Sequence, residues 1–146
     1  MAARVLILGG PTAAGKSGLA LELAERHGAV IVSADAMTVY RGLDIGTAKP
    51  TEAERARVSH TCIDVRDLHE DFNVSDFIDA FDVTSATNDR VIVVGGTPFY
   101  LAALVRPLAQ LPPADASLRA ELEGLPDPHA RLALVDPDTA RRLHPH

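Results

Sequence analysis

The residues best suited to chemistry form a complete phosphate-binding loop, Gly10-Pro11-Thr12-Ala13-Ala14-Gly15-Lys16-Ser17. The apolar run at 5–8, typical of a buried strand, precedes it, and apolar side chains at 19–24 then share one helical face. In this context the N–H groups of the loop and the helix N-terminus converge on a phosphate. Lys16 adds a positive charge, and the Ser17 hydroxyl can bind Mg²⁺. The alternative, a chance glycine turn, does not account for the correct strand and helix on either side.

Two further polar groups follow predicted strands. Asp35 comes after the apolar run at 29–33, and Gly95-Gly96-Thr97 comes after the run at 91–94. Ligands of open α/β sheets bind beyond the carboxyl ends of the strands, so all three groups are expected to face one crevice. Asp35 is then a candidate general base or metal partner, although its spacing equally allows an aspartate that caps a helix. The glycine pair is either a tight turn or a place where a ligand comes close to the backbone.

Other polar residues leave more than one interpretation open. Asp64 ends a predicted third strand at 61–65 and either lies in the second coordination shell of Mg²⁺ or, as is commoner, is a turn residue. A glycine-containing loop at 41–50 is expected to lie over the site. Three of its residues can bind anions, although loop cations are usually only solvated: Arg41, Thr47 and Lys49. The histidines show no metal-ligand spacing, which argues against a zinc site.

The remaining elements alternate between helices and strands. Helices are predicted at 15–27, ending at Gly28 in a left-handed conformation, and at 52–58. A third is predicted after Asn73, with Asp76 completing a capping box, and a fourth starts at Thr97-Pro98. The alternation predicts an α/β fold of the P-loop NTPase type, a parallel sheet with helices on both faces.

The character of the chain changes after Leu108. Five prolines lie between Pro112 and Pro137, and the segments 117–123 and 130–134 are short candidate helices. We therefore expect a P-loop α/β core at 1–110 and, at 111–146, the beginning of a helical subdomain that is cut off.

Composition narrows the class of protein. One domain is expected for 146 residues, and no apolar run is long enough to cross a bilayer. The chain enters its first strand directly, which leaves no room for a signal peptide, and the single Cys62, expected in the core, excludes an internal disulfide. These features predict a cytoplasmic protein, which we expect to be a monomer. The net charge of −6 is concentrated in residues 51–100, which disfavours a broad electrostatic surface for nucleic acid.

Three stretches together resemble the tRNA dimethylallyltransferases. They are the phosphate loop, the run from Ser33-Ala34-Asp35-Ala36-Met37-Thr38 to Gly46-Thr47-Ala48-Lys49-Pro50, and Gly95-Gly96-Thr97 with Tyr100. A phosphate loop alone occurs in many enzymes, whereas the second stretch points to one family. The resemblance implies a Mg²⁺-dependent transfer of a dimethylallyl group from its diphosphate to the exocyclic N6 amine of the adenosine next to the anticodon in tRNA.

The resemblance also implies roles for particular residues. The loop from Gly10 to Ser17 would hold the prenyl diphosphate, although family descriptions often call it ATP-binding, and Ser17 would bind Mg²⁺. Asp35 matches the general base, and the catalytic set is Asp35, Lys16 and Thr12. The tRNA anticodon stem-loop would present a flipped-out adenine to residues of two segments. These residues are Asp35, Ala36, Met37, Thr38 and Thr97.

The chain departs from the family pattern in three ways. Ala36 and Thr38 stand where the family commonly has Ser and Gln, changes that can weaken base recognition, and Pro98 replaces a glycine. Family members are also about twice this length.

Two other functions remain open: a small P-loop kinase that phosphorylates a nucleoside or metabolite with ATP is the alternative, and a non-catalytic nucleotide-binding module is the third interpretation. The run from Asp35 to Pro50 argues against a kinase, which also needs an arginine-bearing lid that no segment clearly supplies.

Overall fold

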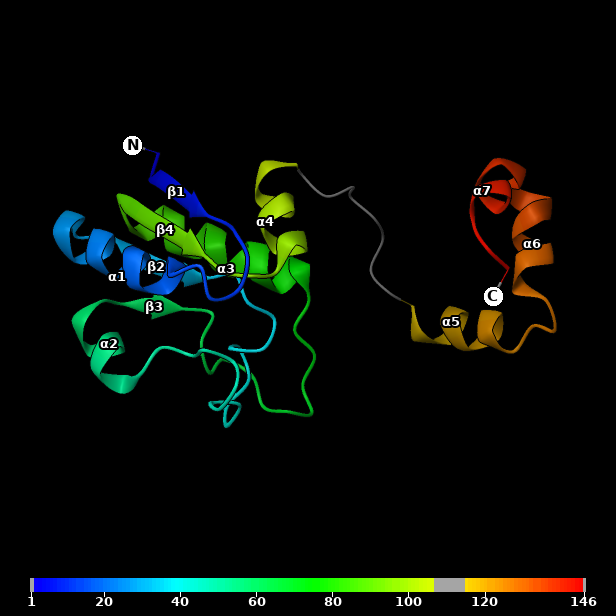
Figure 1. Ribbon diagram of the computed structural model, residues 1–146. Coiled ribbons are helices and arrows are strands. Elements are labelled where there is room, and N and C mark those ends of the chain that lie inside the picture. Colours follow the sequence, from blue (N-terminus) through cyan, green and yellow to red (C-terminus); the bar gives the residue numbers. More distant parts are fainter. Residues whose placement is uncertain (1, 107–114, 146) are drawn as a thin grey trace. The chain divides into compact units, whose positions relative to one another are not determined.

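A computed structural model describes residues 2–106 and 115–145 (Figure 1). Contacts within the chain divide it into two compact units, Met1–Leu108 and Ala109–His146. The expected boundary after residue 110 falls in a segment, 107–114, that lies outside the described residues.

The first unit is built on one parallel sheet. Its strands are β1 (Arg4–Leu8), β2 (Val30–Ser33), β3 (His60–Thr61) and β4 (Arg90–Val94), arranged in the order β1-β4-β2-β3. The pairing of β4 with both neighbours is in register, so that Val94 lies opposite Leu8 on one side and Ser33 on the other. The strands β1, β2 and β4 consequently end at the same edge of the sheet, and the loops that follow them start together.

Helices cover both faces of this sheet, as the alternation of elements predicts. Helix α1 (Lys16–His27) lies on one side, and α3 (Val74–Thr87) and α4 (Pro98–Val105) lie on the other (Figure 1). Side chains of β4 alternate accordingly. Ile92 and Val94 belong to the core cluster that contains Ala20 and Ala24 of α1. Val91 and Val93 belong to the second cluster, in which the Phe77 and Tyr100 rings stack at 4.8 Å.

The predicted helix ends are largely confirmed. Gly28 ends α1 with φ 62°, and Asn73 and Asp76 form a capping box at the start of α3. A second capping box, from Thr51 and Glu54, starts α2 (Glu52–Arg57). Thr97 precedes α4 as expected but makes no side-chain cap bond to that helix.

The prediction of a strand at 61–65 is wrong, because only His60–Thr61 pairs with the sheet. Cys62 and Asp64 have φ of 61° and 53°, and these left-handed conformations interrupt the extended chain. The chain then turns back, and Val65 donates its N–H to Val39 O at 2.8 Å. Cys62 is buried as expected, and desolvation raises the pKa of its thiol to about 11.

The second unit consists of three short helices. They are α5 (Ala116–Glu123), α6 (Pro128–Val135) and α7 (Pro137–Arg142), and aspartate side chains at 115, 127 and 136 cap them. The first two match the candidate helices, whereas α7 was not predicted. His129 Nε2 lies 3.0 Å from Ala140 O and so ties α6 to α7. Within the described residues, no helix has the length and apolar character that a bilayer span requires.

The ends of β2 and β4 come unusually close together. A Cβ at Gly95 would lie 2.0 Å from Ala34 O, so only glycine fits there. Two backbone hydrogen bonds hold the same junction, from Ala34 N to Val94 O at 2.8 Å and from Thr97 N to Ala34 O at 3.1 Å. The close approach is therefore made by the chain's own backbone.

We predict that Gly95→Ala lowers the free energy of unfolding by about 2 kcal/mol or more, because the methyl group forces β2 and β4 apart. Gly96→Ala is the matched control, since a Cβ there meets no atom within 4 Å. Urea denaturation of both variants measures the difference. Equal stability of the two variants would contradict the close contact.

Candidate functional site

A cleft of about 700 Å³ opens where β1, β2 and β4 end. Its walls include the phosphate loop, Asp35 and the glycine pair Gly95-Gly96, so the three predicted polar groups do face one crevice. The loop at 41–50 forms a further wall, as expected for a loop over the site.

The phosphate loop has the backbone geometry that binding an anion requires. Ala13 and Gly15 have φ of 64° and 75°, and Ala13 is thus a non-glycine residue held in a left-handed conformation. Helix α1 starts after Gly15 without a side-chain cap and without an acidic residue in its first turn. Because the first N–H groups of a helix have no partner within the helix, those of α1 remain available to a phosphate.

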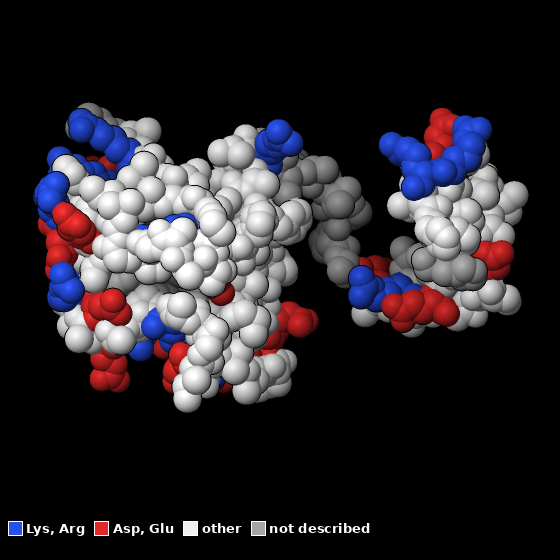
Figure 2. Space-filling view, viewed as in Figure 1, with Lys and Arg blue, Asp and Glu red and all other residues white. Residues whose placement is uncertain are grey.

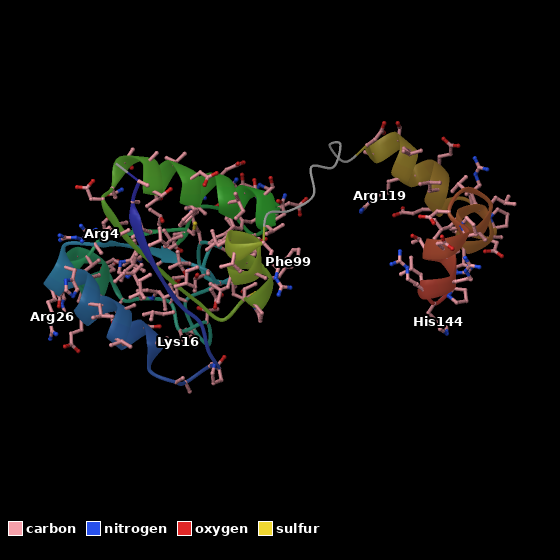
Figure 3. The ribbon with its side chains drawn as sticks, turned by 90° about the horizontal axis from the view of Figure 1, so that it is seen from above. Arg4, Lys16, Arg26, Phe99, Arg119 and His144 are labelled. Carbon is pink, nitrogen blue, oxygen red and sulfur yellow. The ribbon has the colours of Figure 1, made fainter. Side chains whose placement is uncertain are left out.

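Lys16 lies at the start of α1 (Figure 3). Its Nζ donates to Pro11 O at 2.6 Å, so the ammonium folds back over the loop. Exchange of this carbonyl for a phosphate oxygen would need a rotation of this half-buried side chain.

Ser17 fits the role of a single protein ligand to Mg²⁺. It lines the cleft beside Lys16, and within the described residues its hydroxyl has no hydrogen-bond partner. Those residues contain no group of three His, Cys, Asp or Glu that could hold a metal by itself. Mg²⁺ commonly takes one or two protein ligands and completes its shell with water and substrate phosphates, which suits a site of this kind.

Asp35 lies in a turn that fixes one of its carboxylate oxygens. Oδ1 accepts hydrogen bonds from Met37 N at 2.8 Å and Thr38 N at 3.3 Å. Oδ2 has no hydrogen-bond partner among the described residues and remains available in the cleft. Asp35 therefore caps a turn, not a helix, and still offers an acceptor to a ligand.

Two side chains hold this turn against the sheet. Thr97 Oγ1 accepts a hydrogen bond from Ala36 N at 3.0 Å, which explains why it does not cap α4. The Thr38 hydroxyl is buried and lies 2.9 Å from Ser33 Oγ. The position of Asp35 is thus set by β2 and by the start of α4.

The predicted site residues do not all reach the cleft. Those that line it are Thr12, Ala13, Ala14, Gly15, Lys16, Ser17, Asp35, Met37 and Thr38. Gly10, Pro11, Ala36 and Thr97 do not. Their backbone geometry or hydrogen bonds shape the loop and the turn beside it.

Glu54 and His60 line the cleft although their residue types alone did not single them out. His60 Nδ1 lies 2.8 Å from Val58 O, and Glu54 belongs to the capping box of α2. For Glu54 the sequence offers the capping pattern Thr51–Glu54. That pattern predicts where α2 starts, but it does not predict that Glu54 lines the cleft.

Lys49 and Asp64 belong to an ionic cluster around the buried Lys49 side chain. Lys49 Nζ donates to Asp64 Oδ1 at 2.6 Å and to Asp44 Oδ1 at 2.7 Å, and Arg55 donates to Asp64 Oδ2 at 2.6 Å. Lys49 is thus neither solvated nor available to an anion. Of the two interpretations of Asp64, the turn residue is the one that fits this geometry.

The charges of this cluster stabilise one another. Burial by itself raises the pKa of Asp64, but the hydrogen bonds from Lys49 and Arg55 outweigh it and leave the pKa below its ordinary value. Burial likewise lowers the pKa of Lys49, while Asp44 and Asp64 raise it and prevail. Both groups are consequently charged at neutral pH.

Surface charge is mixed around the first unit. On the face shown in Figure 2, blue and red side chains are interspersed, and the described residues form no continuous basic patch there. Several of the basic residues are paired, as Arg57 is with Glu25 and Arg41 with Asp67. This face therefore offers little that would attract nucleic acid by charge alone.

Comparison with known proteins identifies relatives of the whole chain. A family model described as IPP transferase matches residues 38–146. The tRNA dimethylallyltransferase 1 of Citrifermentans bemidjiense is 50% identical over 98% of this chain and 49% of that protein. The tRNA dimethylallyltransferase of Halorhodospira halophila is 50% identical over 100% of this chain and 50% of that protein. The chain thus spans about half the length of the curated relatives it matches.

Solved structures give the same relationship. A eukaryotic dimethylallyltransferase acting on tRNA matches with a TM-score of 0.81 at 28% identity, over 99% of this chain and 38% of that one. The full-length tRNA isopentenylpyrophosphate transferase of Bacillus halodurans matches with a TM-score of 0.62 at 33% identity, over 97% of this chain and 50% of that one. The predicted fold, a P-loop NTPase-like parallel sheet, is confirmed.

We predict that Asp64→Asn destabilises the chain at pH 7 by about 2 kcal/mol, because it removes the charge that compensates Lys49. A carboxyl group with a lowered pKa contributes stability that is present above its unfolded-state pKa, about 3.9, and is lost as the pH falls through its folded-state pKa. The free energy of unfolding of the variant should therefore fall less steeply than that of the parent below about pH 4. Urea denaturation between pH 7 and pH 2 measures both effects.

The matched control is Asp67→Asn, which removes the half-exposed ion pair with Arg41. It should change the stability at pH 7 by less than about 1 kcal/mol. The same loss in both variants would show that burial of the cluster is not the cause.

Proposed function

Because this chain belongs to the IPP transferase family, we propose that its protein transfers a dimethylallyl group from dimethylallyl diphosphate to the N6 amine of the adenosine next to the anticodon in tRNA. The observation that carries the proposal is the meeting of a phosphate loop and a carboxylate oxygen without a partner, Asp35 Oδ2, in one cleft. The names of the relatives supply a dimethylallyl group and tRNA, and the N6 amine next to the anticodon comes from the resemblance described above.

The phosphate loop suits the diphosphate end of the donor. The free N–H groups at the start of α1 and the Lys16 ammonium would bind the diphosphate oxygens. When the C–O bond to the dimethylallyl group breaks, its electron pair stays with pyrophosphate, and negative charge grows where these donors converge. Thr12 lies at the rim of the same cleft and would add a hydroxyl donor.

Mg²⁺ would neutralise further charge on the leaving pyrophosphate. We assign Ser17 as its protein ligand, with the diphosphate and water completing the shell.

Asp35 suits the amine of the acceptor. As the N6 lone pair attacks the allylic carbon, the new C–N bond leaves a proton in excess on nitrogen. Asp35 Oδ2 would accept that proton, while the hydrogen bonds from Met37 N and Thr38 N hold the other oxygen in place. A base fixed in this way needs little reorganisation during the reaction.

The turn around Asp35 would also contact the flipped-out adenine. Met37 is half-exposed and lines the cleft, so it offers an apolar surface to a base, and Thr38 lies beside it. Ala36 and Thr97 do not line the cleft; the hydrogen bond that joins them would hold this turn in place for the adenine. We further propose that the protein binds the anticodon stem-loop of the tRNA. We also propose that it is a monomer and that the reaction takes place in the cytoplasm.

We predict that Asp35→Asn and Lys16→Ala affect different constants in the full-length gene product. Asp35→Asn should lower kcat for dimethylallyl transfer by about 100-fold or more and leave the Kd of dimethylallyl diphosphate nearly unchanged, because only the proton acceptor is lost. Lys16→Ala should raise that Kd by about tenfold or more, because a charge-assisted contact to phosphate is lost. Single-turnover transfer to a tRNA anticodon stem-loop and calorimetric titration measure the two constants.

Glu22→Gln, on the exposed side of α1, is the matched control and should alter neither constant. If Asp35→Asn abolished diphosphate binding instead, Asp35 would be a metal or structural residue, and its role as the base would be wrong.

A further inference from the structure

One wall of the cleft is a loop without regular secondary structure. Between Tyr40 and Lys49 the chain forms only turns, yet several of its residues line the cleft. They are Leu43, Ile45, Gly46, Thr47 and Ala48. One bond inside the loop, from Thr47 Oγ1 to Leu43 O at 2.7 Å, supports its middle. The position of this wall must therefore be set mainly by contacts at the ends of the loop.

Lys49 makes those contacts from a single atom. Its Nζ donates to Tyr40 O at 2.8 Å, to Asp44 Oδ1 at 2.7 Å and to Asp64 Oδ1 at 2.6 Å. A lysine ammonium has three N–H donors, so all of them are used. The first bond closes the loop end to end, the second holds its middle, and the third fastens it to the turn after β3. The Lys49 side chain is 3% exposed, so the ammonium itself is shielded from water.

The backbone next to this ammonium is held in conformations that need support. Ala48 and Asp64, both non-glycine residues, have φ of 53°. Such conformations persist where the surrounding contacts over-determine them. The bonds from Lys49 to Asp64, and from Asp64 N to Thr38 O at 3.1 Å, supply that support and lead directly to the turn that carries Asp35.

The other ion pair of the loop is of a different kind. Arg41 binds Asp67 at 2.9 Å, but the two side chains are 53% and 52% exposed. Pairs as exposed as this contribute little to stability. The Tyr40 end of the loop is held instead by backbone bonds, such as the one from Arg41 N to Arg66 O at 2.9 Å.

We propose that Lys49 is a positioning residue which holds residues 40–49 as a preformed wall of the cleft that the phosphate loop also lines. With all three donors engaged, it does not itself meet a ligand. It orders the wall before the ligand binds. The free energy of binding therefore does not include the entropic cost of ordering a ten-residue loop. The identity of the ligand rests on the proposed function, whereas the ordering of the loop does not.

Two variants test this role in the chain as it stands. Lys49→Met removes all three bonds, whereas Asp44→Ala removes only the bond to Asp44. Because the Asp44 side chain is 66% exposed, Asp44→Ala should leave the melting temperature unchanged. Native-state proteolysis with thermolysin, with cleavage before Leu43 or Ile45 located by mass spectrometry, measures the order of the loop. Calorimetric titration with dimethylallyl diphosphate and Mg²⁺ measures binding. Asp67→Ala, which removes only the exposed ion pair with Arg41, is the matched control.

We expect Lys49→Met to raise the cleavage rate at these sites by about tenfold or more. The Kd of dimethylallyl diphosphate should also rise by about tenfold or more, which corresponds to about 1.4 kcal/mol of binding free energy. Asp44→Ala should raise the Kd about threefold with no change in melting temperature, which a merely structural role would not produce. Asp67→Ala should match the parent. Cleavage rates and Kd values within twofold of the parent in both Lys49→Met and Asp44→Ala would overturn the proposal.

The two proposals fail in different ways. If the parent chain bound no dimethylallyl diphosphate, the proposed function would be in error, and the proteolysis rates alone would decide the role of Lys49. If Lys49→Met did not fold, the cleavage rate and the Kd of Asp44→Ala would decide it, because that substitution lies at an exposed side chain.

Discussion

The contact between Ala34 and Gly95 is the constraint on which the site depends. It brings the ends of β2 and β4 within the distance that only glycine permits, and three hydrogen bonds through Ala34, Ala36 and Thr97 lock the junction. The turn that carries Asp35 starts from this junction, and the register of β1 with β4 sets the phosphate loop beside it. A carboxylate from one strand and an anion site from another therefore share a cleft without being neighbours in the sequence.

The electrostatics of the cleft follow from which polar groups are satisfied and which are left without a partner. Side chains cap the helices α2, α3 and α5–α7, whereas α1 and α4 have no side-chain cap. Of these two, α1 starts in the cleft, after Gly15. Lys49 and Asp64 neutralise each other inside the cleft wall, so the cationic group left to meet a ligand at the phosphate end is Lys16. In the same cleft Asp35 keeps one oxygen without a partner among the described residues. A cationic group and a free carboxylate oxygen in one cleft suit a reaction in which an anion leaves and a proton is taken up.

Local sequence patterns made several features of the fold and of the site predictable. The phosphate loop, the capping box at Asn73 and the αL end of α1 each depend on a few adjacent residues, and all three were predicted from those residues. The extent of β3 was not, because φ values above 50° at Cys62 and Asp64 are imposed by contacts with distant segments. The role of Lys49 was missed for the same reason, since its acceptors lie nine, five and fifteen positions away. Burial of a charged side chain depends on such tertiary pairing, which residue type alone does not reveal.

The central claim is that the phosphate loop of this cleft serves a prenyl diphosphate and not a nucleotide. Calorimetric titration of the chain with dimethylallyl diphosphate and, separately, with ATP, both with Mg²⁺, tests it most directly, because the loop and its cleft lie within the described residues. We expect saturable binding of dimethylallyl diphosphate and weaker binding of ATP. Tighter binding of ATP would contradict it and would favour a kinase or a nucleotide-binding module built on the same fold.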